Sequence, residues 1–206
     1  MEPFHPDLRV TRTRQAIRTA FLGLLEEKGF EAITVKDITA RALINRATFY
    51  AHYDDKYALM NAIEEQLIED LLAIRAKQMP ALVQLINEGK ETMETSPIAI
   101  ATLKYISENR TLLNAMLGPH GNIAFQHRLK DFIWKSTFTN SAAPFIKEEK
   151  LRVPSQYLAS YLTSAHIGVI QQWLQDGLKE TPEQMASILS TMTINGILYA
   201  AGLKEQ

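Results

Sequence analysis

The chain has 206 residues, of which 46% are hydrophobic, and its 22 basic and 23 acidic side chains leave a formal net charge of −1. This length suits one large domain or a small domain joined to a larger one. The absence of cysteine excludes disulfide scaffolds, thiolate zinc sites and thiol nucleophiles, and it is typical of the reducing cytoplasm. Because no signal peptide and no run of about 18 uncharged apolar residues is visible, we expect a soluble, cytoplasmic chain without a membrane partner.

The N-terminal part of the sequence has the pattern of three helices. Apolar residues recur at helical spacing over residues 11–28. Thr34 is a predicted N-cap for a short helix that ends near Ala42, and Asp37 stands at the position of a capping-box acid. A second short helix over residues 45–53 begins with Asn45 as its N-cap. Two short helices joined by a tight connection form a helix-turn-helix pattern.

The remaining residues are also predicted to be helical, which makes the fold class all-α with about nine helices. Prolines and glycines fall between stretches of helical periodicity, and no strand pattern is present. Pro80 is expected to end the helix that starts at Lys56, because proline lacks the N–H that a helix interior needs. The expected elements are helix 56–79, a less regular segment to about residue 94, helices 97–117, 123–140, 155–176 and 181–203, and a loop over 141–154.

The net charge of the chain conceals a local excess of arginine. Residues 1–58 hold nine basic and eight acidic side chains, net +1, and the other 148 residues hold thirteen and fifteen, net −2. Arginines that lie beside a phosphate backbone replace condensed counterions, so an arginine cluster indicates salt-dependent nucleic-acid binding. The alternative is a solvated N-terminal arm. The cluster consists of Arg9, Arg12, Arg14 and Arg18, with no acid among them.

The second short helix has the composition of a helix that reads DNA. At 100° per residue, Phe49 and Tyr53 lie on one edge and are expected to face the core. Ala47 and Thr48 lie on the opposite side, where their methyl groups can contact thymine methyls in a major groove. Arg46 is long enough to reach a guanine edge. The alternative is a short amphipathic helix on the surface of a helical bundle.

Residues 33–59, ITVKDITARALINRATFYAHYDDKYAL, resemble the DNA-binding domain of the TetR/AcrR family of bacterial transcriptional regulators. That family has a Thr-led helix, a turn, a Ser/Thr-Phe-Tyr-x-His-Phe recognition helix and a lysine that opens the next helix. Two residues depart from its pattern: Leu43 replaces the usual glycine of the turn, and Tyr53 replaces the usual phenylalanine. The matching residues are Thr34, Ile38, Ala42, Thr48, Phe49, Tyr50, His52, Tyr53, Lys56 and Leu59.

The resemblance implies a role for each DNA-contacting residue and a division into two domains. Thr34 and Lys56 would bind phosphates at helix N-termini, and Tyr50 and His52 would donate hydrogen bonds to phosphates. Residues 1–55 would form the DNA-binding domain, and residues 56–206 a helical effector-binding and dimerisation domain. The residues expected to face base edges are Asn45, Arg46, Ala47 and Thr48.

The last two helices are apolar on almost every side, and a helix of that kind is buried all round. Residues 112–202 resemble one branch of TetR-like C-terminal domains, and the resemblance implies a homodimer built from these helices. The alternative is a helix pair buried within one chain. The residues expected at the dimer interface are Leu158, Leu162, Val169, Trp173, Leu189, Met192 and Gly196.

Aromatic, polarisable and polar side chains on the C-terminal helices are expected to surround an effector pocket. The alternative is that these side chains belong to the hydrophobic core. His127 and Asp131 are four residues apart, but they lack a convincing third metal ligand, so no metal and no cofactor is expected. The candidate effector-binding residues are Tyr105, Met116, Phe125, Trp134, Tyr161 and His166.

These expectations combine into one function and one alternative. The chain is expected to be a repressor that binds a palindromic DNA operator as a homodimer and is released by an unknown small-molecule effector. The alternative is a TetR-like coactivator whose C-terminal domain binds a protein partner. An enzyme is not expected, because the sequence has no nucleophile-base pair, no phosphate-binding loop and no set of metal ligands.

Overall fold

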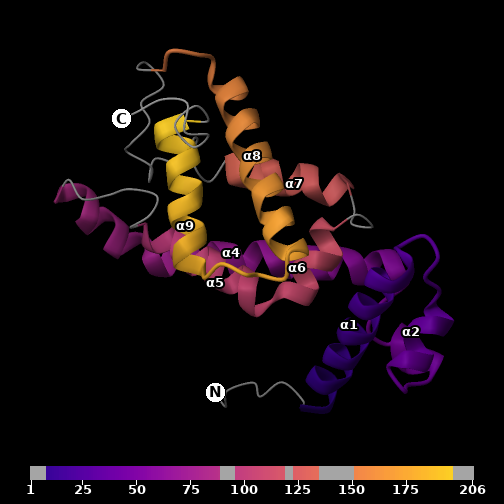
Figure 1. Cartoon of the computed structure of the whole chain (residues 1–206). Helices are drawn as coiled ribbons and strands as arrows, with labels where there is room; N and C mark the ends of the chain where they lie inside the picture. Colours follow the sequence, from indigo (N-terminus) through magenta and orange to yellow (C-terminus); the bar gives the residue numbers. More distant parts are fainter. Residues whose placement is uncertain (1–7, 89–95, 119–122, 135–150, 197–206) are drawn as a thin grey trace, which may run out of the picture. The chain divides into compact units, whose positions relative to one another are not determined.

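The structure is a computed structural model that describes residues 8–88, 96–118, 123–134 and 151–196 (Figure 1). The described residues form nine α-helices, one π-helical turn and no strand, which confirms the all-α fold class. No helix among them is long and apolar enough to cross a membrane. The elements are α1 (Leu8–Lys28), α2 (Val35–Arg41), α3 (Arg46–Tyr50), α4 (Lys56–Asn87), α5 (Pro97–Glu108), α6 (Arg110–Leu117), α7 (Ile123–Trp134), α8 (Ser155–Gln175), α9 (Pro182–Ser190) and the π-helical turn η3 (Thr191–Asn195).

The chain divides into two compact units, and the N-terminal unit is larger than the domain predicted from the sequence. It comprises residues 1–67 and 111–122, whereas the predicted boundary lies after residue 55. The first turns of α4 belong to it because Leu59, Met60 and Leu67 are buried there. The C-terminal unit comprises residues 68–110 and 123–206.

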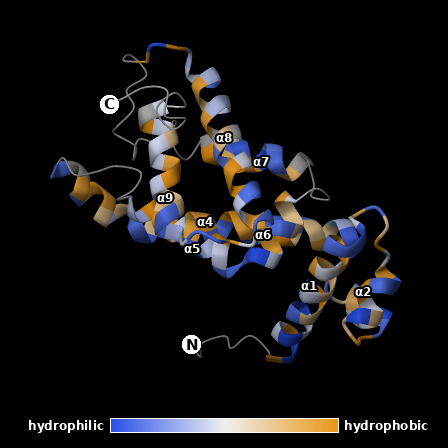
Figure 2. Ribbon diagram, in the orientation of Figure 1, coloured by the Kyte–Doolittle hydropathy of each residue, from blue (hydrophilic) through white to orange (hydrophobic). Residues whose placement is uncertain are grey.

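The helices of the N-terminal unit pack together through one buried, apolar side of each helix. Hydrophobic and hydrophilic residues mix along α1 and α2, so each helix can bury one side and expose the other (Figure 2). Helix α1 packs against α2, and α2 packs against α3. The fully buried side chains of this unit include Ile17, Phe21, Leu25, Ile33, Ile38, Phe49, Leu59, Leu67 and Met116.

The C-terminal unit is held by two helix pairs. Helix α5 packs against α9, and α7 packs against α8. Trp173 on α8 is almost completely buried, and its indole N–H donates to the backbone carbonyl of Glu180 at 3.0 Å. Helix α9 starts at a capping box formed by Thr181 and Gln184, with Pro182 as its first residue.

Two helix ends differ from the sequence-based expectations. Helix α4 continues through Pro80 to Asn87, so the predicted stop before Pro80 is wrong. Beyond the proline, Leu82 is buried, and such packing offsets the lost backbone hydrogen bond. The single helix predicted over 97–117 is instead two helices, because Asn109 has non-helical backbone angles and its side-chain amide donates to the Tyr105 carbonyl.

Some expected elements lie outside the described residues. These are the continuation of α7 from residue 135 to 140, the predicted loop over residues 141–150, and the last helix beyond residue 196.

The turn between α2 and α3 holds a leucine in a left-handed conformation. Leu43 has φ of 55° and its side chain is 92% exposed. A left-handed conformation costs an L-residue with a Cβ about 1–2 kcal/mol. Leu43 therefore adopts a positive φ where the family usually has glycine. Within the described part of the chain, burial of its side chain does not offset the cost of this conformation.

Leu43→Gly is expected to raise the free energy of unfolding by about 1 kcal/mol, because glycine adopts positive φ without the steric penalty. Urea denaturation followed by circular dichroism measures the change. Leu43→Ala is the matched control, since it removes the side chain but keeps the Cβ, and it is expected to leave stability nearly unchanged. A Leu43→Gly variant no more stable than the alanine variant would contradict the strained-turn explanation.

Candidate nucleic-acid interface

Helix α2 starts at a fully formed capping box. The Thr34 hydroxyl accepts a hydrogen bond from the Asp37 backbone N–H at 3.2 Å, and the Asp37 carboxylate accepts one from the Thr34 backbone N–H at 2.9 Å. The Lys28 ammonium at the end of α1 lies 2.8 Å from the same carboxylate. Hydrogen bonds from Lys28 and then from Thr34 hold the pKa of Asp37 well below its usual range. The start of the helix-turn-helix is thereby tied to α1, and Thr34 remains at the surface.

Helix α3 presents the predicted base-reading residues at the surface. Asn45 is its N-cap, and the side-chain oxygen accepts hydrogen bonds from the backbone N–H and the hydroxyl of Thr48, at 2.7 and 2.9 Å. Phe49 is fully buried, whereas Asn45, Arg46 and Ala47 are exposed. The two predicted faces of this helix are therefore present: one apolar anchor faces the core, and a polar edge with a small side chain faces outward.

The end of α3 carries a cluster of aromatic side chains. Phe49 meets Tyr50 edge to face at 5.6 Å between ring centroids, and Tyr53 lies 5.9 Å from Phe49. The His52 and Tyr53 rings are 6.4 Å apart. Tyr50 is 53% exposed while the buried Phe49 holds its ring in place. Ring contacts with Phe49 and Tyr53 therefore position Tyr50 and His52, as hydrogen-bond donors to a phosphate require.

Lys56 has a different role from the one predicted. Its ammonium donates to the backbone carbonyls of Phe30, Glu31 and Ile33 at 3.0, 3.1 and 3.1 Å, and lies 4.6 Å from the centre of the Phe30 ring. An ammonium has three N–H donors. All three are directed at the connection between α1 and α2, so we do not include Lys56 among the proposed phosphate contacts.

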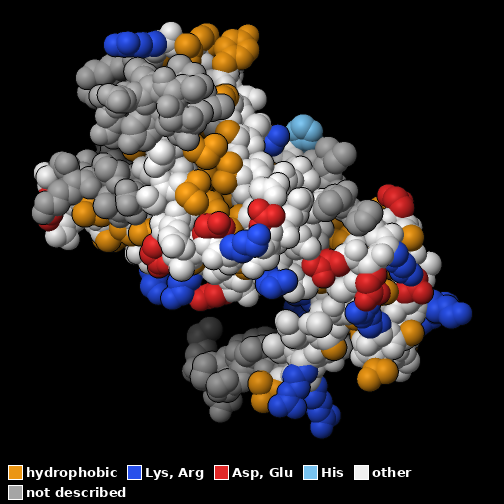
Figure 3. All heavy atoms as spheres, viewed as in Figure 1, with side chains coloured by type: hydrophobic (Ala, Val, Ile, Leu, Met, Phe, Trp, Pro, Cys, Tyr) orange, Lys and Arg blue, Asp and Glu red, His pale blue; other side chains and the backbone are white. Residues whose placement is uncertain are grey.

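The other cations of the N-terminal unit fall into two groups. Arg41 pairs with Glu27 at 2.6 Å, and Lys28 pairs with Asp37. In the described part of the chain, no ion pair involves Arg12, Arg14, Arg18 or Arg46. Lys and Arg side chains gather at the N-terminal end of α1 (Figure 3). These arginines are therefore available to an anionic partner.

The predicted effector residues do not form one cluster. Met116 is fully buried in the N-terminal unit, and the other five belong to the C-terminal unit. Tyr161 is 63% exposed on α8. The Trp134 side chain lies outside the description.

Three of the predicted effector residues have defined surroundings in the C-terminal unit. Phe125 is fully buried in α7. Tyr105 donates its hydroxyl to Asp70 at 2.7 Å. His166 Nε2 lies 2.9 Å from the Thr193 hydroxyl, and burial lowers the pKa of His166.

Polar residues instead line a hollow of about 350 Å³ between α7 and α8. His127 and Asp131 belong to it, and among the described residues no group of three potential metal ligands exists. Sequence reasoning treated these two residues only as half of a metal site, because the α7–α8 contact that adds the other lining residues is not readable from spacing. The lining residues are His127, Lys130, Asp131, Gln156, Ala159, Ser160 and Thr163.

The predicted dimer residues divide between the inside and the surface of the C-terminal unit. Trp173 and Leu189 are buried within the chain, and Leu158, Leu162 and Val169 are partly buried. Met192 is 38% exposed, and Gly196 has φ of 81°. Apolar side chains that the prediction missed are exposed over α8 and α9 (Figure 3). These are Tyr157 and Ile188, together with Ile194 of η3 and Tyr161, which was assigned to the pocket.

The model of the tetR family of bacterial regulatory proteins matches residues 17–63, and that of a transcriptional regulator C-terminal region matches residues 93–195. Among solved structures, a TetR transcriptional regulator from Streptococcus agalactiae 2603V is 26% identical, with a TM-score of 0.62, over 90% of this chain and 96% of that one.

Two curated relatives are similar over most of this chain. An uncharacterized HTH-type transcriptional regulator, YxbF, of Bacillus subtilis (strain 168) is 27% identical over 184 residues, which are 87% of this chain. That match spans only 44% of the relative's own length. Nucleoid occlusion factor SlmA of Vibrio atlanticus (strain LGP32) is 23% identical over 185 residues, 85% of this chain and 91% of that protein.

Lys56→Met is expected to lower the free energy of unfolding by about 2 kcal/mol, because it leaves three carbonyl groups without their charged donor while keeping an apolar stem. Chemical denaturation of the full chain measures the loss. Lys36→Met is the matched control, since Lys36 is exposed on α2. Equal stability of the two variants would mean that the ammonium does not hold the α1–α2 connection.

Proposed function

This chain belongs to the TetR family of bacterial regulatory proteins, and from that premise we propose that it is a homodimeric repressor that binds a palindromic operator and is released by a small molecule. It is a transcriptional regulator and not an enzyme, because the family, YxbF and the Streptococcus agalactiae protein are all named as regulators. The observation that carries the proposal is the exposed edge of α3, anchored by the buried Phe49.

In this proposal, α3 lies in the major groove and reads base edges. Arg46 reaches a guanine, and the short side chain of Ala47 lets the helix approach the bases closely. Tyr50 and His52 donate to backbone phosphates and fix the orientation of α3. The Asn45 side-chain oxygen accepts hydrogen bonds from Thr48, so these two residues contact base edges through the other polar atoms of their side chains. The arginines of α1 add salt-dependent affinity.

The homodimer is proposed to form through the exposed apolar surface of α8 and α9. Tyr157 and Tyr161 lie four residues apart on α8, and Ile188 at the end of α9 lies four residues before Met192 in η3. Solvent-exposed apolar side chains in contiguous stripes mark contact surfaces. A twofold axis through such a surface presents two copies of α3 to the two halves of a palindromic site.

Release by a small molecule requires that the molecule bind one arrangement of the dimer better than another. A ligand with equal affinity for both arrangements shifts nothing. The polar hollow between α7 and α8 suits a small polar effector, because it offers Lys130, Asp131 and the Ser160 hydroxyl as hydrogen-bonding groups. We therefore propose a polar effector. The aromatic pocket expected from the sequence would instead bind a more apolar molecule.

A second candidate function is a TetR-like protein whose C-terminal unit binds another protein. The relative named nucleoid occlusion factor favours it, because its name describes an activity other than the regulation of a promoter. A titration in which a protein partner changes operator affinity, while small molecules never do, would select this function over ligand-released repression.

Arg46→Ala is expected to weaken binding to the operator by about 1–3 kcal/mol and to change binding to unrelated DNA little, because a bidentate contact to guanine carries sequence information. Mobility shifts with the upstream region of the chain's own gene and with scrambled DNA measure both affinities. Arg12→Ala is the control, since a phosphate contact is lost equally on every sequence. Absence of any salt-sensitive, sequence-selective shift by the wild type would overturn the DNA-binding proposal.

Tyr161→Asp is expected to convert the dimer to a monomer, because it places a charge at the centre of a desolvated apolar surface. Light scattering after size-exclusion chromatography measures the mass. Tyr57→Asp is the matched control, as Tyr57 is 54% exposed in the N-terminal unit. If both variants keep the dimer mass, the interface lies elsewhere.

A further inference from the structure

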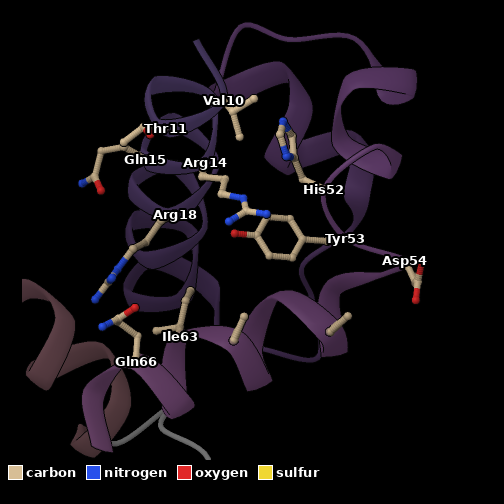
Figure 4. A pocket seen from close by; sticks show the side chains of 12 residues that line it. Val10, Thr11, Arg14, Gln15, Arg18, His52, Tyr53, Asp54, Ile63 and Gln66 are labelled. Atoms are coloured by element: carbon tan, nitrogen blue, oxygen red, sulfur yellow. The ribbon is translucent and has the colours of Figure 1, made fainter. Parts of the chain in front are cut away.

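A groove crosses the N-terminal unit between α1, the α3–α4 connection and the start of α4, and its volume is about 600 Å³ (Figure 4). That volume falls within the range of sites that bind small organic molecules. One face of α1 and one face of α4 supply most of its walls. The lining residues are Val10, Thr11, Arg14, Gln15, Arg18, His52, Tyr53, Asp54, Ala58, Ala62, Ile63 and Gln66.

The floor of the groove is apolar because α4 carries small residues where it faces α1. Ala58 and Ala62 lie one turn apart on α4 and leave open the space that larger side chains would fill. Ile63, which is almost completely buried, closes the bottom. The groove can therefore take an apolar body from the side of α4.

The α1 side of the groove is cationic. Arg14 and Arg18 are four residues apart on one face, an arrangement in which like charges repel within a helix. Neither forms an ion pair within the described residues. Asp54 is the single carboxylate of the lining, and Figure 4 shows it at the far edge of the groove from both arginines. Figure 4 shows the Arg14 side chain turned toward Tyr53 and the Arg18 side chain turned toward Gln66, and an anion bound at this wall offsets the charge of both.

Tyr53 adds a neutral donor at the same place. Its ring projects from the α3–α4 connection into the space in front of α1, where Arg14 also points (Figure 4). The hydroxyl has no hydrogen-bond partner among the described residues. The side chain is partly exposed, so its hydroxyl is accessible to a polar group that enters the groove.

We propose that this groove binds an organic anion with an apolar body, its carboxylate, sulfonate or phosphate held by Arg14, Arg18 and the Tyr53 hydroxyl and its body on Ala58 and Ala62. The site is separate from the hollow between α7 and α8. His52 lines the groove and is also a proposed phosphate contact, so the bound anion competes with DNA directly. Only this competition rests on the proposed function.

Fluorescence titration of the full chain with 8-anilinonaphthalene-1-sulfonate tests the site, because this probe joins an aromatic body to a sulfonate. Ala62→Leu fills the floor and is expected to remove the groove's share of the bound probe. Asn61→Leu, an exposed neighbour on α4, is the matched control and is expected to bind as the wild type does. The Arg14→Ala/Arg18→Ala double variant is expected to lower the affinity for the probe about tenfold. Arg12→Ala is expected to leave this affinity nearly unchanged.

N-phenyl-1-naphthylamine, the same body without the sulfonate, is expected to bind about tenfold more weakly than the sulfonate at this site. Unchanged probe binding by Ala62→Leu, or an equal loss in Arg12→Ala and the double variant, would overturn the proposal. So would equal binding of the neutral and anionic probes. Circular dichroism confirms that each variant is folded.

A mobility shift then tests the competition with DNA. Saturating sulfonate is expected to weaken operator binding by the wild type but not by Ala62→Leu, which should bind DNA normally when no probe is present. Loss of DNA binding by Ala62→Leu alone would mean that the groove belongs only to the DNA interface. If the chain binds no DNA, the proposed function fails, and the fluorescence titration still decides whether the site exists.

Discussion

One partly buried cation joins the start of α4 to the connection between α1 and α2 in the N-terminal unit. The Lys56 ammonium, at the first residue of α4, donates to three carbonyl groups of the α1–α2 connection and lies against the Phe30 ring. Removing an ammonium from water is costly unless hydrogen bonds replace its hydration, and three carbonyls with an aromatic face do so. Residues 34–53 begin and end beside this contact. The contact therefore fixes the first residue of α4 to the α1–α2 connection, on one side of the helix-turn-helix.

Charges in the N-terminal unit divide between holding the fold and meeting a partner. Lys28 with Asp37, and Arg41 with Glu27, are engaged within the chain and tie α1 to α2. Helix α3 needs no ion pair, because the Asn45 cap and the buried Phe49 hold it. Among the described residues, the exposed Arg46 and Ala47 side chains consequently have no structural contact to keep, which suits the proposed role of reading base edges.

The features predicted correctly from the sequence are those decided within a few residues. The caps at Thr34 and Asn45 depend on a side chain and a backbone N–H three positions away, so spacing alone identifies them. The role of Lys56 depends on carbonyl groups more than twenty residues earlier, and no local pattern contains that information. Because α8 is apolar on every side, its sequence does not indicate which side is buried. In the fold, Trp173 is buried and Tyr161 is exposed.

Control of DNA binding can follow two physically different routes in this architecture. In the proposed homodimer, a ligand in the C-terminal unit would act only by favouring one arrangement of the two N-terminal units over another. Its effect would be bounded by its differential affinity for the two arrangements. A ligand in the groove of the N-terminal unit would contact Arg14 and His52, which are also proposed DNA contacts, and would require no change of arrangement. Its effect is bounded instead by its concentration relative to its own dissociation constant. The residues that line the two proposed sites do not overlap, so the two proposed routes would let the protein respond to two chemically different ligands.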